Sequence, residues 1–140
     1  MPSANKHLRN ARRNYDAAVA GTGEPAIRSW AAVALFYAAH QLVHAVLDGE
    51  DVLAQEMRHP ESHGSTATVK GTSALVAQFY RDIDLAYKSL FAAGKGVRYE
   101  GLVVAESDFN DLMNKDYAAV AAWARDKLTK RGRTLDSDWP

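Results

Sequence analysis

Residues 30–47, "WAAVALFYAAHQLVHAVL", decide the fold of this chain. Apolar residues in this stretch recur with helical spacing, and they cover most of the circumference of a helix rather than one stripe. A helix of this kind is stable only where other elements surround it. Pro25 suits its first turn, and the polar run "DGED" follows its end. We therefore predict a helix from Pro25 to Leu47 that is the central and most buried element.

Three more stretches have the spacing of helices with one apolar side. The first covers residues 4–20 and ends at "GTG". The second covers residues 72–93, and Gly94 is its expected stop because glycine commonly ends a helix. The third is capped by Ser107 and runs to about residue 131.

Four such helices predict an all-α fold, a single four- to five-helix bundle. We expect the bundle to span residues 1–133, with residues 134–140 as a frayed tail. Residues 48–72 are polar and are predicted to form a long loop, which in a compact domain is often functional. The side chains expected to be most protected in the core are Leu35, Leu42, Phe79, Ile83 and Trp123.

The composition excludes several classes of site. The chain has 140 residues, and its 17 Lys and Arg balance its 17 Asp and Glu, so a basic binding surface must be local. Because cysteine is absent, disulfides, thiolate metal sites and cysteine nucleophiles are excluded. The N-terminal residues lack the apolar core of a signal peptide, and we predict no membrane-spanning run. These features predict a cytoplasmic protein.

The loop contains the stretch "RHPESH", residues 58–63. Cleavage of RNA without a metal needs a proton shuttle near neutral pH, which His63 can supply, and a cation on the phosphate, which Arg58 can supply. His59 would orient the pair. The spacing alone is not specific, since ten arginines and five histidines predict about one such pair by chance. The alternative is a polar connector between two helices.

Two histidine pairs have a spacing of four residues: His40 with His44, and His59 with His63. Imidazoles suit Zn or Ni, so four of them can form a nitrogen-rich site. Alternatively, His40 and His44 are half-buried residues of a packed helix, bonded to polar neighbours. The second interpretation is favoured because the spacing carries little information, and we predict neither a metal nor a cofactor.

Local clusters of cations are candidates for RNA contacts. Arg9, Arg12 and Arg13 crowd the first helix, and a second basic run lies at residues 127–133, where it also complements a helix C-terminus. A solvated face is the alternative for both clusters. Arg98 and Tyr99 follow a glycine, and this pair can stack a base or pack the end of the bundle.

Three segments together resemble the HEPN superfamily of small helical-bundle proteins, and most of all its bacterial branches. They are "WAAVALFYAAHQLVHAVL", then "HPESH", then "FYRDIDLAYKSLFAAGKGVRYEG", and the resemblance spans roughly residues 5–100. In that branch, a histidine is expected where this chain has Gln41. Many members are metal-independent endoribonucleases of toxin–antitoxin, CRISPR or phage-defence systems.

The resemblance implies a protein that binds RNA or nucleotide. Members of this superfamily combine an arginine, a polar residue and a histidine across a homodimer interface, and Arg58, His59 and His63 match these roles in order. It thus implies a homodimer, with an antitoxin or a nucleotidyltransferase as a partner protein. The alternative is a non-catalytic helical module that pairs with a nucleotidyltransferase or a defence component.

Overall fold

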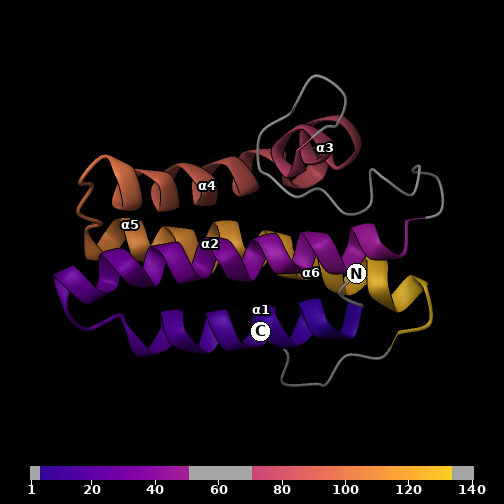
Figure 1. The fold of residues 1–140 in the computed structure, drawn as a ribbon, viewed down its shortest axis with the longest axis horizontal. Coiled ribbons are helices and arrows are strands. Elements are labelled where there is room, and N and C mark those ends of the chain that lie inside the picture. Colours follow the sequence, from indigo (N-terminus) through magenta and orange to yellow (C-terminus); the bar gives the residue numbers. More distant parts are fainter. Residues whose placement is uncertain (1–3, 51–70, 134–140) are drawn as a thin grey trace.

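The computed structural model describes residues 4–50 and 71–133, and within these ranges it contains helices and no strands. The predicted all-α bundle is confirmed (Figure 1). Its elements are α1 (Ala4–Ala20), α2 (Pro25–Asp48), α3 (Thr72–Phe79), a 3-10 turn (Arg81–Ile83), α4 (Asp84–Tyr99), α5 (Glu106–Asp111), a π-helical segment (Leu112–Tyr117) and α6 (Ala118–Lys130).

Helix α2 is the centre of the bundle, as predicted. In Figure 1, α1 runs along one side of α2, α4 along the opposite side, and α5 and α6 lie behind it. The side chains of Leu35, Phe36, Leu42 and Val43 are fully buried because helices approach α2 from several directions. Burial all round explains why its apolar residues do not form a single stripe.

By length and composition, α2 could also cross a membrane, contrary to the expectation that no stretch would pass this test. Most of its apolar stretch (72%) is buried against the rest of the bundle. The core helix of a soluble protein has the same properties, so this helix is compatible with a soluble protein.

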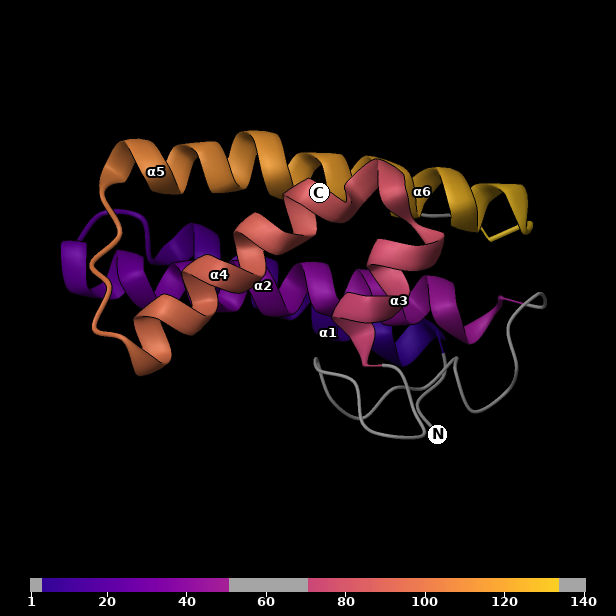
Figure 2. The ribbon, with the colours of Figure 1, turned by 90° about the horizontal axis from the view of Figure 1, so that it is seen from above.

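The predicted helix over residues 72–93 is wrong in two respects. It is broken at Tyr80, whose φ of −127° and ψ of 56° are not helical, so α3 turns sharply away from α4 (Figure 2). Because the break changes the register, Tyr80 is buried and Phe79 is 40% exposed, which corrects its predicted place in the core. Trp123 is only partly buried, packed against the core.

The second error is the expected stop at Gly94, because α4 continues to Tyr99. A Cβ atom at Gly94 would lie 3.4 Å from Cβ of Phe36, so the absence of a side chain allows α4 to pack closely on α2. The chain reverses instead at Gly101, whose φ of +70° favours glycine.

The last helical stretch begins and ends close to the predicted positions, but Ser107 is not its cap. Ala105 holds the N-cap position and has no side chain that could accept a hydrogen bond. Between α5 and α6 the helix widens into the π-helical segment, a form that is frequent at functional sites. The ring of Tyr117 in this segment stacks on Tyr15 of α1 at 5.1 Å.

Candidate functional site

Three histidine rings lie together between α1 and α2. The ring centroids of His40 and His44 are 4.2 Å apart, and those of His7 and His44 are 5.3 Å apart. His7 and His44 are buried, with 5% and 8% of their surface exposed, while His40 is half-buried. The four-residue spacing places His40 and His44 on one side of α2, and α1 brings His7 against them.

Each imidazole has a polar partner on another part of the fold. Nδ1 of His7 donates a hydrogen bond to Oε1 of Gln41 over 2.6 Å. His40 Nδ1 lies 3.2 Å from the hydroxyl of Tyr87 on α4, and His44 Nε2 lies 3.2 Å from the hydroxyl of Thr72 on α3. The interpretation of His40 and His44 as packed histidines bonded to polar neighbours therefore agrees with the geometry.

The second ring nitrogen of His7, Nε2, differs from the other histidine nitrogens described above. This nitrogen is buried and has no hydrogen-bond partner within the described part of the chain. Because Nδ1 carries the proton that Gln41 accepts, Nε2 of a neutral ring presents a lone pair and can take a proton. Among residues 4–50 and 71–133, no group of three His, Cys, Asp or Glu could hold a metal ion. Within the described residues, these three rings therefore contact polar groups and one another.

The predicted catalytic residues Arg58, His59 and His63 lie outside the described residues, and so does most of the predicted loop. The residues that flank this segment contact the histidine cluster and the ends of two helices. Gly71 and Thr72 begin the chain's return, where Thr72 contacts His44. On the other side, Glu50 follows His44 by six residues. The residue that follows Gly71 at the C-terminal side of this segment, Thr72, therefore contacts the histidine cluster.

Glu50 is held by the residues that directly follow α3 and α6. Its carboxylate accepts hydrogen bonds from the Tyr80 hydroxyl (2.9 Å) and from Arg131 (3.1 Å). A second nitrogen of Arg131 donates to the backbone oxygen of Val46 at the end of α2 (2.5 Å). Burial, together with the nearby Glu50 carboxylate, raises the pKa of the Tyr80 phenol. This network fixes the end of α2 against α3 and α6.

The residues predicted to contact nucleic acid fall into two groups. Arg98 donates to the hydroxyl of Tyr37 (2.7 Å), and its guanidinium carbon lies 4.9 Å from the centroid of the Tyr99 ring. Tyr99 is 72% exposed, so it does not pack the end of the bundle as the alternative required. Its ring is instead exposed to solvent and lies against the guanidinium of Arg98.

The arginines of α1 form the second group. Arg9 and Arg13 are exposed, whereas Arg12 forms a salt bridge with Asp16 (3.3 Å). Arg133 donates to the side chain of Asn5 (2.9 Å), so the end of the chain after α6 meets the start of α1. The two basic runs, more than a hundred residues apart in sequence, lie at the same end of the bundle (Figure 1).

His7 is the residue of this cluster that the sequence analysis missed. It lies four residues before Ala11 and eleven before Ala18, both fully buried, so it belongs to the inward side of α1. The sequence analysis assigned Arg9, Arg12 and Arg13 of this helix to a candidate RNA contact and gave position 7 no role. A histidine in register with two buried alanines was the available signal.

The chain was compared with protein-family models, curated proteins and solved structures. No family model, no curated protein and no solved structure matches the chain.

Proposed function

We propose that this chain is a cytoplasmic HEPN-type bundle protein that binds RNA and cleaves it without a metal through Arg58 and His63. The observation that supports this most is the place of the histidine cluster. Thr72, directly after the segment that carries both residues, bonds to His44. One end of that segment is therefore joined through Thr72 to a group of three imidazoles, side chains that can both donate and accept hydrogen bonds.

The proposed chemistry follows from the residue types. His63 takes the proton of the ribose 2′-hydroxyl, and the 2′-oxygen attacks phosphorus. Arg58 neutralises the charge that grows on the phosphate oxygens. The bond from phosphorus to the 5′-oxygen breaks, and that oxygen leaves as a hydroxyl with a proton from water or from the imidazolium. The products are a 2′,3′-cyclic phosphate and a 5′-hydroxyl, and His59 keeps Arg58 and His63 aligned.

Two described surfaces support RNA binding. The exposed Arg9 and Arg13 lie at the end of the bundle where the basic run after α6 also lies, and phosphate groups are recognised by such cations. Tyr99, backed by the guanidinium of Arg98, presents an aromatic face on which a base can stack. These residues position RNA, and the histidine-bearing segment acts on it.

The test is incubation of the purified chain with single-stranded RNA in EDTA. We expect cleavage products with a 2′,3′-cyclic phosphate, because the ribose hydroxyl is the nucleophile and no metal is needed. Sedimentation at micromolar concentration should give twice the 15.3 kDa chain mass, as a site shared across a homodimer requires. A strictly monomeric protein that cleaves RNA would contradict the shared site but not the chemistry.

A specific observation favours the second candidate, a non-catalytic interaction module for a nucleotidyltransferase, an antitoxin or a defence protein. The first two turns of α2 expose large apolar side chains, including Trp30 (61%) and Ile27 (55%). The connection between α4 and α5 exposes Val103 (70%) at the same end, where the backbone N–H of Val104 bonds to Ser29 of α2 (3.0 Å). Exposed apolar groups gathered at one end of a domain are typical of protein interfaces.

A further inference from the structure

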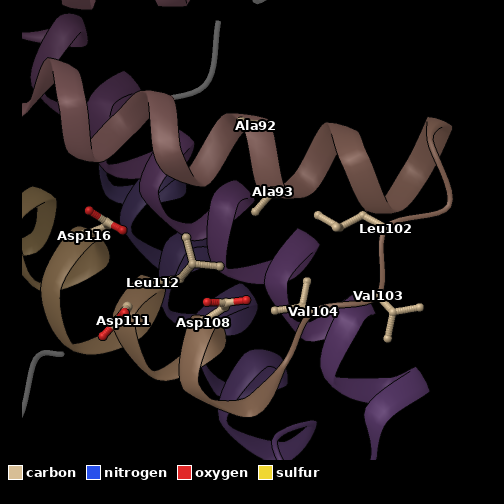
Figure 3. Close-up of a pocket in the computed structure, with 9 residues that line it drawn as sticks. All are labelled: Ala92, Ala93, Leu102, Val103, Val104, Asp108, Asp111, Leu112 and Asp116. Atoms are coloured by element: carbon tan, nitrogen blue, oxygen red, sulfur yellow. The ribbon is translucent and has the colours of Figure 1, made fainter.

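A groove of about 360 Å³ lies between α4 and the helical stretch that begins with α5 (Figure 3). In Figure 2, α4 and this stretch diverge toward the connection at residues 100–105, which closes the wide end. One wall is apolar and includes Ala92, Ala93 and Leu102. A Cβ atom at Gly96 would lie 2.9 Å from Leu102, so the glycine lets Leu102 fold back into this wall.

The other wall carries three carboxylates. Asp108 and Asp111 come from α5 and Asp116 from the π-helical segment, and all three line the groove in Figure 3. None of them forms an ion pair with a cation in the part of the chain that the structure describes. Burial raises the pKa of the Asp116 carboxyl, Lys115 opposes this, and the negative charge of Asp111 adds to it. The groove therefore combines an apolar surface with three carboxylates, of which Asp116 also interacts with the charge of Lys115.

The arrangement of the carboxylates restricts the ligand. Among the described residues, no three acidic or histidine side chains converge closely enough to hold a metal ion. A compact cation could therefore not contact all three aspartates at once. An RNA phosphate is excluded because it has the same charge as the wall. A suitable ligand is elongated, has several separate positive centres, and has an apolar chain between them.

We propose that this groove binds a linear aliphatic polyamine. Its ammonium groups pair with Asp108, Asp111 and Asp116, and its methylene chain lies on Ala92, Ala93 and Leu102. The groove volume is at the lower end of the roughly 300–1,000 Å³ usual for small-ligand sites, which matches a narrow, unbranched molecule. None of the residues that line the groove is among those proposed to act on RNA.

Isothermal titration of the full chain with spermidine at about 150 mM salt tests the proposal, because long-range attraction is screened there. We expect one saturable site. Asp108→Asn and Asp111→Asn should each weaken binding about threefold, as expected for exposed ion pairs. Ala92→Phe should abolish binding, because Ala92 lines the groove and is exposed, so a larger side chain there should obstruct the ligand without disturbing the core. Asp82→Asn, an exposed aspartate on the turn before α4, is the matched control and should bind like the parent chain.

The alternatives give different results. An absence of saturable binding would overturn the proposal. So would an equal loss in Asp82→Asn, or complete displacement of spermidine by an equal concentration of Mg²⁺, since both would mean attraction to negative charge in general. Retained binding by Ala92→Phe would place the ligand elsewhere. Circular dichroism of each variant establishes that a lost site is not a lost fold.

Discussion

His7 of α1 donates a hydrogen bond to Gln41 of α2 across 34 residues of sequence, with 2.6 Å between Nδ1 and Oε1. This bond joins the two helices at the histidine cluster. It also determines which nitrogen of His7 carries the proton and leaves Nε2 as an unpartnered acceptor within the described residues. The hydrogen bond between His7 and Gln41 therefore connects α1 to the histidine cluster on α2.

Replacement of His7 by alanine should destabilise the fold. The change removes the hydrogen bond to Gln41 and the packing of a buried ring, and we expect a loss of about 1–3 kcal/mol in the free energy of unfolding. Urea denaturation followed by circular dichroism measures this. Arg13→Ala, on the exposed side of the same helix, should change stability little. Equal effects of the two variants would mean that the pair does not hold α1.

Arg131 should be needed for the stability of the helix ends. It bonds both to the Val46 backbone oxygen and to Glu50, so Arg131→Ala is expected to cost about 1–3 kcal/mol. Arg131→Lys should restore only part of this, because one ammonium cannot reproduce the fork of the guanidinium. Lys130→Ala is the control, since its salt bridge with Asp126 is exposed. Full rescue by lysine would show that charge alone matters.

The tyrosines predict unfolding in alkali. Burial raises the pKa of Tyr80, Tyr87 and Tyr117 above the ordinary value of 10.0, so the folded state binds protons that the unfolded state releases. Their contribution to stability is complete below pH 10 and is lost as the pH rises toward the folded-state pKa. In a pH titration, tyrosinate absorbance of these residues should therefore appear together with loss of helix. Ionisation of all six tyrosines near pH 10 with helix intact would contradict this.

Asp116→Asn should stabilise the chain at neutral pH. The raised pKa of this carboxyl means that its charged form is less favourable in the folded state. The gain should be present at pH 7 and vanish as the pH falls below 3.8, where the parent carboxyl is protonated in both states. Thermal melts at the two pH values measure the difference. A gain that is unchanged at low pH would assign the effect to packing rather than to charge.

The sequence predicted the helices whose inward faces are continuous, and missed the features that depend on contacts between helices. The stripe of α1 and the apolar surround of α2 are encoded locally, and both helices lie where they were expected. The break at Tyr80 is stabilised by Glu50, which follows α2, and the passage of α4 through Gly94 depends on Phe36 of α2. Neither distant partner is visible in a window of neighbouring residues.

The candidate site was predicted in part for the same reason. The pair His40 and His44 follows from helical spacing, and so does the polar environment that a half-buried imidazole needs. His7 was missed because it contributes through the packing of a second helix. The acidic groove was missed because its aspartates come from α5 and the π-helical segment, and its apolar wall from α4 and the connection after it.

The most direct test of the account is RNA cleavage by Arg58→Ala and His63→Ala in EDTA, beside the parent chain and Arg125→Ala as a control outside the proposed site. We predict that the parent and the control release fragments ending in a 2′,3′-cyclic phosphate, that both site variants lose this activity, and that their helical content is unchanged. His59→Ala should retain part of the activity, because its role is to align the other two. A parent chain that cleaves no RNA, or site variants that cleave as well as it does, would contradict the account and leave the stretch "RHPESH" as a connector in an interaction module.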